Sequence, residues 1–456
     1  MLYDEQKIWY NLGKKYTENM NFKGYLETVE EKFHSIKADI PLPKAVYTLS
    51  ELFTNNGSSL FAVGGVIRDF LYSMHHGGKF SPKDVDLATE APPDKVIAIL
   101  SSPAAQAAHI KTFPKGEAFG VISAVIDGEE YEIATFREDG EYSDGRRPDS
   151  VSFSTPAKDA QRRDLTFNAL FYDIHKKEIR DYNLNHEGEG QGLQDIKNLV
   201  ARPVGNARDR FREDKLRIPR LIRFFSRFNP GQIMQHLDQD TLAAIQEFKN
   251  LAGVSPERIA AEFTGGLQKS ANPVNYLKNY EATGLLPAVF PGLQVDMQDV
   301  DRIGVVKNIK AVLAWLLKSG DPKTVRIQLN HLKYPNDVSD AASFLVRLYR
   351  FDVSQVAQLL KHRDLYKQLE SPELQSAGQK VLTTDVMDFA RIAGKENELQ
   401  HFLNYQPTVK SQDFMHLKGK AISDAMSGAE ASAYQASNNE TLARRRTEPQ
   451  RSQDSI

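Results

Sequence analysis

The sequence predicts an α+β protein, in which a small mixed sheet with helices near the N-terminus precedes an all-helical C-terminal half. Two patterns support this prediction. Short apolar runs of strand length alternate with helical patterns over residues 41–138, whereas the pattern is helical from about residue 157 to about residue 436. The chain has 456 residues, which is too long for one compact core, so we expect several domains.

Turn and capping residues set the bounds of the elements expected in the first domain. A helix ends at Asn56-Gly57, another has proline in its first turn, and two antiparallel strands turn at Asp127-Gly128. The predicted order is a helix over 42–57, a strand over 59–63, a helix over 64–74, a strand over 83–89, a helix over 92–102 and two strands within 119–138.

The rest of the chain carries weaker local signals. Residues 1–40 are polar and we expect them to be helical. Ser255-Pro256 is a good helix start, because serine caps a helix and proline fits its first turn. The last residues, 437–456, are polar and charged and are predicted to be a disordered tail.

The composition limits the class of protein. A hydrophobic content of 41% and a charged content of 26% are typical of a folded cytosolic protein. No apolar run is long enough for a membrane span and the N-terminus lacks the apolar core of a signal peptide, so we expect a cytoplasmic protein without membrane contact. The absence of cysteine excludes disulfides, thiolate metal sites and cysteine nucleophiles. A net charge of −2 means that any nucleic-acid-binding surface must be local.

Two aspartates stand one residue apart in "PKDVDLAT", residues 82–89. In a strand, Asp84 and Asp86 would project from the same face, where their charges repel unless a cation or water lies between them. Mg²⁺ suits such a pair, because it binds through one or two carboxylates together with substrate phosphates. Glu132 is the candidate for a third acid, although Glu130 has the same strand parity. For an isolated pair of this kind, solvated acids at a sheet edge are the usual alternative.

A double glycine, Gly64-Gly65, separates a predicted strand from a predicted helix. Without side chains, backbone N–H groups can approach a phosphate at the helix N-terminus, and Arg68 could reach the same anion. Such a turn is more often structural when it occurs alone. Its position some twenty residues before the aspartate pair favours a nucleotide site.

Six motifs together resemble one family. The segments "VGGVIRDFL", "KDVDLAT", "EIATFRE", "EYSDGRRPDSV", "RRDLTFNAL" and "REDKLRIPRLIRF" occur in the order and spacing of class II tRNA nucleotidyltransferases, which include CCA-adding enzymes and bacterial poly(A) polymerases. The resemblance implies a polymerase-beta-like head and catalysis with Mg²⁺. It also implies a division of the chain into an N-terminal extension over 1–40, a head over 41–180, a neck over 181–275, an RNA-binding body and tail over 276–436, and the disordered end over 437–456.

The resemblance also implies roles for single residues. Asp84 and Asp86 would bind the metal ions, with Glu132 as the third acid. Other side chains would contact the nucleotide. Gly64, Gly65 and Arg68 would hold its triphosphate, Arg163, Asp164 and Asn168 would contact the nucleotide and its ribose, Asp214 and Arg217 would pair with its base, and Arg220 and Arg223 would lie towards its phosphates.

Base reading can be argued from hydrogen-bonding capacity. Asp214 and Arg217 are three residues apart, so they would share one face of a helix. Cytosine and adenine offer an amine next to a ring acceptor, which a carboxylate and a guanidinium complement, whereas uracil and guanine do not. An ordinary intrahelical ion pair is the alternative. Pro219 lies inside the expected helix, where it would bend the axis and shift this template.

The product is expected to be CCA at the 3′ end of tRNA, made from CTP and ATP. Residues 138–151 are similar to the flexible loop of family members that complete the terminal A. Poly(A) polymerase is the close alternative, since arginines at 444–446 and 451 give a diluted basic tail. An inactive RNA-binding protein of the same fold is a further alternative. A basic cluster over 201–228 is expected to contact RNA phosphates, and lysines of the helical C-terminal half could hold the tRNA acceptor arm by its shape. The oligomeric state cannot be predicted.

Overall fold

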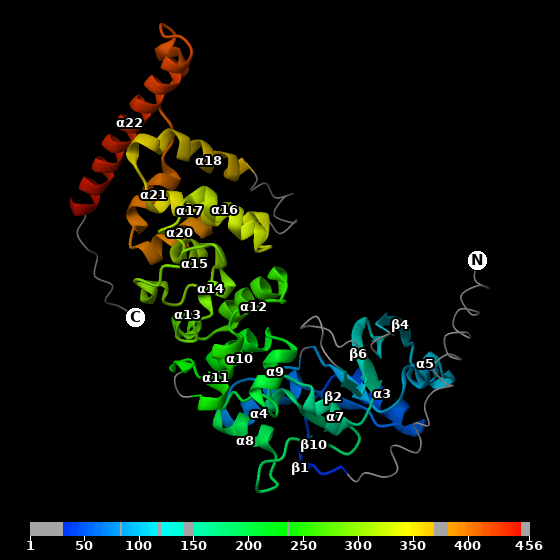
Figure 1. Cartoon of the computed structure of the whole chain (residues 1–456). Helices are drawn as coiled ribbons and strands as arrows, with labels where there is room; N and C mark the ends of the chain where they lie inside the picture. Colours follow the sequence, from blue (N-terminus) through cyan, green and yellow to red (C-terminus); the bar gives the residue numbers. More distant parts are fainter. Residues whose placement is uncertain are drawn as a thin grey trace. The chain divides into compact units, whose positions relative to one another are not determined.

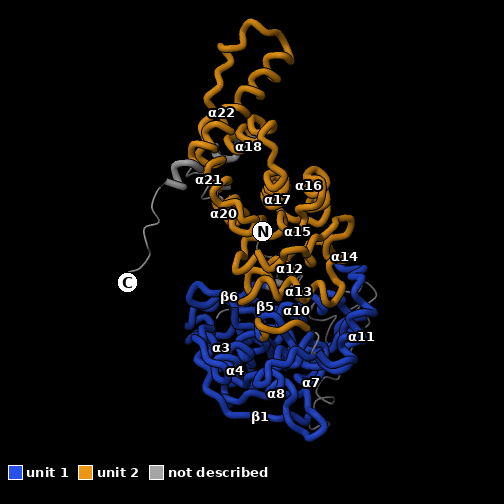
Figure 2. The backbone as a smooth tube through the Cα atoms, turned by 90° about the vertical axis from the view of Figure 1, so that its left-hand side faces the viewer, with its two compact units in different colours: residues 1–228, 236–254 blue, residues 229–235, 255–456 orange. Residues whose placement is uncertain are grey.

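The computed structural model describes residues 31–82, 84–116, 120–140, 150–234, 237–368 and 382–447. The chain forms two compact units, one of residues 1–228 and 236–254 and one of residues 229–235 and 255–456 (Figure 2). Most of the extension predicted over 1–40, the loop over 141–149 and residues 448–456 of the predicted tail lie outside the described residues. The finer division into head, neck and body stays a prediction.

The described residues of the first unit form an eight-stranded mixed sheet, seen in the blue-to-green part of Figure 1. Its order is β1-β10-β9-β2-β3-β6-β5-β4, and β3 pairs in parallel with β6 while the other neighbours pair antiparallel. The strands are β1 (His34–Lys37), β2 (Phe61–Val63), β3 (Leu87–Thr89), β4 (Lys111–Gly116), β5 (Val121–Ile126), β6 (Glu129–Thr135), β9 (Leu170–Asp173) and β10 (Glu178–Asp181). A separate pair joins β7 (Arg137–Asp139) to β8 (Val151–Phe153).

Helices of the first unit connect these strands and follow them. They are α3 (Lys44–Asn55), α4 (Gly65–His76), α5 (Pro93–Leu100), α6 (Pro103–Ala107), α7 (Pro156–Gln161), the 3₁₀ turn η2 (Thr166–Asn168), α8 (Gln191–Asn198), α9 (Ala207–Glu213), α10 (Arg217–Phe228) and α11 (Gln239–Phe248). An aromatic cluster of Phe61, Phe136 and Phe171 packs in the core, with ring centroids 5.5 to 6.5 Å apart.

The second unit is helical in its described residues, as predicted. It contains α12 (Pro256–Lys269), α13 (Pro273–Ala282), α14 (Leu286–Val289), η4 (Val300–Ile303), α15 (Ile309–Leu316), α16 (Pro322–His331), α17 (Asn336–Tyr349), η5 (Val353–Gln355), α18 (Val356–Gln368), α20 (Leu382–Ala393), α21 (Glu396–Asn404), η6 (Ser411–Phe414) and α22 (Lys420–Thr447). In neither unit does a described helix combine the length and apolarity needed to cross a bilayer.

Local turn chemistry confirms several predicted bounds. α3 ends at Asn55, and Gly57 follows with φ +66°, a conformation that suits glycine. β5 and β6 form the predicted hairpin, in which Asp127 (φ +54°) and Gly128 (φ +84°) both take the left-handed conformation of a two-residue turn. The predicted α+β fold is therefore confirmed, with the sheet in the N-terminal half.

Three expectations on secondary structure were wrong. The region after residue 157 contains strands β9 and β10, because a short apolar run such as "LFYD" pairs between β2 and β10 although its sequence also suits a buried helix. Within the extension predicted to be helical, residues 34–37 are the strand β1, which pairs with β10. α22 continues to Thr447, past residue 437, where the disordered tail was predicted to begin.

We predict that the close packing of α8 against η2 makes Gly192 necessary. A Cβ at Gly192 would lie 2.5 Å from the backbone oxygen of Thr166, so Gly192→Ala should lower the free energy of unfolding by about 1–3 kcal/mol. Gly265→Ala is the matched control in another helix, because a Cβ there meets no atom within 4 Å. It should raise stability by about 0.5–1 kcal/mol. Urea unfolding followed by circular dichroism measures both; equal effects would contradict the prediction.

Candidate active site

The aspartate pair lies just before β3. Asp84 and Asp86 are exposed whereas Val85 and Leu87 are buried, so both acids are accessible to solvent. The predicted strand is shorter than expected, because β3 begins only at Leu87 and Asp84 has φ +50°. The N–H of Val63 donates to the carbonyl of Asp86 at 3.0 Å, which ties this segment to β2.

The register of the sheet distinguishes the two candidates for a third acid. Leu87 pairs with Ile133 between parallel β3 and β6, which brings Glu132 next to Asp86 and leaves Glu130 two residues away. Partial burial raises the pKa of Asp86, Arg163 opposes this rise, and the charges of Glu132 and Asp84 add to it. Arg163, Glu132 and Asp84 therefore all act electrostatically on Asp86.

These acids fit a Mg²⁺ site whose remaining ligands come from the substrate. Within the described ranges, no three carboxylate or imidazole groups converge into a ready-made metal site. Asp84 and Asp86 nevertheless provide exposed carboxylates, and the pKa of Asp86 is raised first by burial and then by the charges of Glu132 and Asp84, which a cation would offset. Mg²⁺ is commonly held by one or two carboxylates with phosphate oxygens completing its ligands.

Gly64 is required by the backbone of its turn. Its φ of +67° and ψ of −111° are accessible mainly to glycine, and a Cβ would meet Arg163 Nη1 and the carbonyl oxygen of Asn168, each at 3.4 Å. The N–H of Gly64 donates to Leu170 O at 3.2 Å. Gly64 therefore shapes the turn before α4, which begins at Gly65. The first N–H groups of this helix lack intrahelical acceptors.

A chain of hydrogen bonds brings four predicted site residues together. Arg68 Nη1 donates to Asn168 Oδ1 at 2.8 Å, and Asn168 Nδ2 donates to Asp164 Oδ1 at 3.1 Å. Arg220 Nε donates to Asp164 Oδ2 at 2.7 Å. The chain links α4 to α10 through η2, and it fixes the orientation of the Asn168 carboxamide because its oxygen faces a cation and its nitrogen a carboxylate.

Two arginines of the predicted triphosphate site lie against one aromatic ring. The guanidinium carbon of Arg68 is 4.7 Å from the centroid of Phe224, and that of Arg223 is 4.4 Å from it. Arg68 is buried and also pairs with Asp69 at 2.9 Å. Asp69 pairs in turn with Arg227 at 3.0 Å, so α4 and α10 are joined by ionic as well as aromatic contacts.

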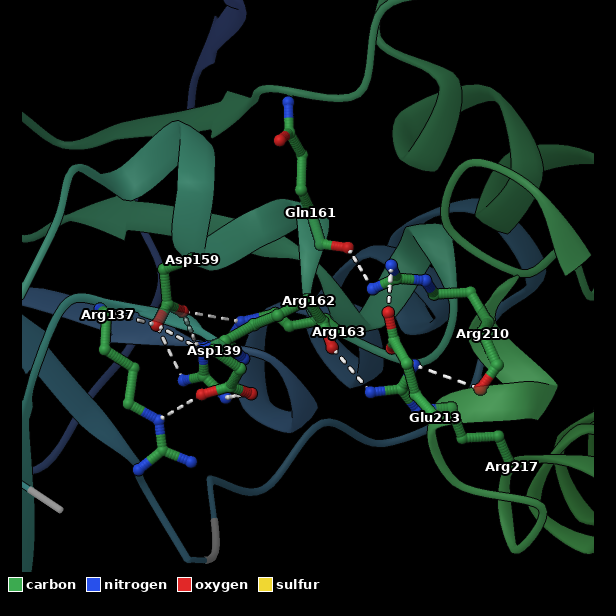
Figure 3. A network of polar contacts seen from close by, with 9 residues as sticks. All are labelled: Arg137, Asp139, Asp159, Gln161, Arg162, Arg163, Arg210, Glu213 and Arg217. Carbon is green, nitrogen blue, oxygen red and sulfur yellow. Dashed lines mark hydrogen bonds and ion pairs between the residues drawn. The ribbon is translucent and has the colours of Figure 1, made fainter. Parts of the chain in front are cut away.

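Arg163 is held by an acid that the sequence reasoning missed. Its Nη2 lies 3.0 Å from Asp159 Oδ2, and its guanidinium stacks over Phe171 at 5.0 Å. Asp159 also pairs with Arg162 at 2.6 Å (Figure 3). Burial would raise the pKa of Asp159, but Arg163 and Arg162 outweigh it and lower the pKa. The four-residue spacing of Asp159, on α7, and Arg163, just after its end, is the signal that could have identified this pair.

The predicted template does not lie on one helix. α9 ends at Glu213, Asp214 is extended with φ −149° and ψ 106°, and α10 begins at Arg217. Asp214 Oδ1 instead accepts from the N–H of Leu216 at 3.0 Å. The kink expected at Pro219 is also absent. Pro219 is the third residue of α10, where an N–H group has no intrahelical acceptor, so proline removes no hydrogen bond of the helix.

Arg217 is buried among acceptors of the protein. It pairs with Glu213 Oε2 at 2.5 Å and donates to the carbonyls of Arg162 at 2.8 Å and Arg210 at 3.3 Å (Figure 3). Glu213 also pairs with Arg210, whose Nη1 donates to Gln161 O at 2.7 Å. Glu213, missed from the sequence although it lies four residues before Arg217, therefore anchors the template to the C-terminal end of α7.

Comparison with known families matches two segments of the chain. Residues 60–202 match the family described as "Poly A polymerase head domain". Residues 236–297 match the family described as "Probable RNA and SrmB- binding site of polymerase A".

Two curated relatives are similar over most of the chain. A CCA-adding enzyme of Staphylococcus saprophyticus is 30% identical over 369 residues, 72% of this chain and 84% of that protein. A CCA-adding enzyme of Staphylococcus epidermidis is 29% identical over 333 residues, 69% of this chain and 75% of that protein.

Solved structures share the fold. The CCA-adding enzyme of Bacillus stearothermophilus in complex with CTP has a TM-score of 0.57 at 22% identity and covers 89% of this chain and 98% of its own. The CCA-adding enzyme of Thermotoga maritima complexed with tRNA has a TM-score of 0.56 at 17% identity, with 90% and 99% covered.

We predict that Asp164 makes the fold sensitive to acid. Burial would raise the pKa of Asp164, but Arg220, Asn168 and the N–H of Leu165 outweigh it and hold the pKa at about 2. A lowered folded-state pKa stabilises the protein above the ordinary carboxyl pKa of about 4, and this contribution is lost as pH falls towards 2. Asp164→Asn should therefore cost about 2–3 kcal/mol at pH 7 and little at pH 2.

Urea unfolding from pH 7 to pH 2 measures this difference. Asp240→Asn, which changes an exposed acid in the first turn of α11, is the matched control and should follow the wild-type curve. A loss in Asp164→Asn that is the same at every pH would contradict the ionic origin of the stabilisation.

Proposed function

The chain belongs to the family of class II CCA-adding enzymes and poly(A) polymerases and is a tRNA nucleotidyltransferase that adds CCA to tRNA 3′ ends; we propose that the residues around Asp84 and Asp86 perform this addition. One observation carries the assignment of the site. Two exposed acids stand beside Glu132 where β3 and β6 run in parallel, with Arg163 acting on the same group. The substrates are CTP, ATP and a tRNA whose 3′ end is incomplete, so we expect the enzyme to act in the cytoplasm.

The reaction is a displacement at the α-phosphorus of the incoming nucleotide. The 3′-hydroxyl oxygen of the RNA forms a new bond to that phosphorus, and the bond to pyrophosphate breaks. Asp84 and Asp86 would hold Mg²⁺, which supplies charge stabilisation for the attacking and leaving oxygens when it is bound. Arg68 and Arg163 would orient the triphosphate, and their own contacts to Asn168 and Asp159 limit their movement.

Asp164 and Asn168 are better suited to positioning other groups than to reading the ribose alone. Both oxygens of Asp164 accept hydrogen bonds, from Leu165 and Asn168 on Oδ1 and from Arg220 on Oδ2. Asn168 is engaged at its oxygen and at its nitrogen. We propose that Asp164 and Asn168 orient Arg220 and Arg68. These two arginines, together with Arg223, would lie towards the phosphates.

Selection of C and A is assigned to Asp214 and Arg217. Their hydrogen-bonding complementarity does not depend on a common helix, because each residue lies at an end of its own helix. Arg217 is held by Glu213, so a base would meet a pre-oriented guanidinium rather than a flexible one. Glu213 therefore has the role of a positioning residue.

A direct assay tests the function against the poly(A) alternative. Purified protein with Mg²⁺ should extend a tRNA that lacks its 3′ end by C, C and A, and stop, when CTP and ATP are both present. ATP alone should add no long tail to an unstructured RNA. Long A ladders would establish a poly(A) polymerase instead, and no extension of either RNA would reject both activities.

We predict that Glu132, rather than Glu130, serves the reaction. Glu132 lies beside Asp86 by strand register, so Glu132→Gln should lower kcat by about tenfold or more, whereas the matched Glu130→Gln should leave kcat unchanged. Asp86→Asn, which removes a proposed metal ligand, should lower kcat by at least about a hundredfold. Single-turnover addition of CTP measures all three. Equal losses in both glutamate variants would contradict the register argument.

We predict that Asp214 contributes mainly to base discrimination. Asp214→Ala removes the acceptor for the exocyclic amine of cytosine or adenine, so the preference for CTP over UTP should fall by about tenfold or more. Lys215→Ala is the control, because Lys215 is the half-buried neighbour whose contact is to Asn250. The ratio of kcat/KM for the two nucleotides is the measurement. An unchanged ratio with lower overall activity would assign Asp214 a structural role only.

A further inference from the structure

A cavity of the first unit lies outside the candidate active site. Its volume of about 620 Å³ falls within the range of small-molecule sites. It is lined by the segment between β10 and α8, by residues 202–206 before α9, and by the end of α7. Among the described residues that line it, none belongs to the predicted metal and nucleotide site, although Arg202 and Arg210 belong to the basic cluster expected over 201–228.

Two side chains of this cavity are left with donor groups only. The oxygen of Asn185 accepts from the N–H groups of Glu187 and Glu189, both at 2.9 Å. The oxygen of Asn206 caps α9 by accepting from Arg208 N–H at 2.9 Å and Asp209 N–H at 3.4 Å. Each carboxamide therefore keeps its NH₂ group for a ligand.

Charged side chains of the lining add to this excess of donors. Arg202 pairs with buried Asp195 through Nε at 3.0 Å, and 40% of its side chain is exposed, so its two terminal nitrogens remain as donors at the cavity. Asp209 is the carboxylate among the described lining residues, and it pairs with Arg212 at 2.9 Å. A ligand made of acceptors suits this lining better than one with donors of its own.

The cavity is connected to the template through Arg210. Arg210 lines the cavity, donates to Gln161 O and pairs with Glu213, which also holds Arg217 (Figure 3). The side chain of Gln161, a further lining residue, points away from this ionic network in Figure 3. A ligand in the cavity would therefore contact Arg210, whose partner Glu213 also holds Arg217, the residue proposed to bind the base.

We propose that this cavity is a second phosphate-binding site, separate from the triphosphate site, which takes a phosphate group of RNA or of a free nucleotide. A phosphate offers acceptor oxygens alone, and it matches the NH₂ groups of Asn185 and Asn206 and the terminal nitrogens of Arg202. The inference goes beyond CCA addition, because binding of phosphate in the cavity does not require that activity.

Two substitutions test the site with little change to the fold. Asn185→Asp and Asn206→Asp keep an oxygen for the backbone N–H groups, and aspartate caps a helix about as well as asparagine. Both replace the NH₂ group by a negative oxygen that repels phosphate. The matched control is Asn272→Asp, which caps α13 through Asn275 N–H at 3.1 Å in the second unit and adds the same charge.

Two binding measurements on the full chain separate the sources of the phosphate. Equilibrium dialysis with labelled inorganic pyrophosphate reports a small ligand, and filter binding of a tRNA lacking CCA reports the RNA backbone. In at least one of them, both cavity variants should weaken binding by about tenfold, the size expected for losing a hydrogen bond to a charged group. Asn272→Asp should bind as the wild type does.

Each outcome of these measurements either supports or overturns the phosphate site. Weaker binding of pyrophosphate assigns a free phosphorylated ligand, and weaker binding of tRNA alone assigns a backbone phosphate. Binding equal to that of Asn272→Asp in both measurements overturns the proposal; Arg202→Gln, measured in parallel, replaces either variant that fails to fold. If the wild type binds in this way but adds no CCA, the proposed function fails while the phosphate site stands.

Discussion

A carboxylate enclosed between two helices organises the candidate site. Asp164 joins η2 to α10 through Arg220, and Asn168 extends this link to Arg68 on α4. Removing one partner from such a set leaves a charge without compensation in a poorly solvated place, which is far more costly than the net value of the pair. The positions of the arginines that face the triphosphate in our proposal therefore depend on an acid whose two oxygens are engaged within the protein. Gly64 completes the arrangement, because its turn leaves room for Arg163 beside the carbonyl of Asn168.

The arginines around the template fall into two groups. Arg217 and Arg220 pair with Glu213 and Asp164 in partly or fully buried surroundings, so these contacts belong to the fold. Arg208 and Arg212 pair with Glu247 and Asp209 while 42% and 63% of their side chains stay exposed. Exposed pairs contribute about 0–1 kcal/mol and can exchange a carboxylate for a phosphate. The local basic excess expected from the sequence over 201–228 is thus smaller than a count of charges implies.

Sequence reasoning succeeded where the local chemistry permits one structure. The Asp127-Gly128 hairpin and the end of α3 follow from residues that tolerate positive φ. It failed where tertiary contacts decide. β9 is a four-residue apolar run, which is too short for the spacing of its apolar residues to predict a strand. The break between helices at Asp214 lies in a stretch of good helix formers. The acids that hold Arg163 and Arg217 could have been found from their spacing of four residues. Which of Glu130 and Glu132 faces Asp86 depends on the register of β3 and β6, which no local pattern specifies.

The short strand β1 has a consequence for any shortened version of this protein. It covers the outer side of β10 along Glu178–Asp181, although the matched head segment starts only at residue 60. Its four residues include His34, Ser35 and Lys37, and short polar edge strands discourage pairing between molecules. A fragment cut at the family boundary would bare the β10 edge, whose unpaired N–H and C=O groups invite self-association. Residues 34–37 therefore limit aggregation. Their removal would lower the solubility of the protein before it lowered its turnover.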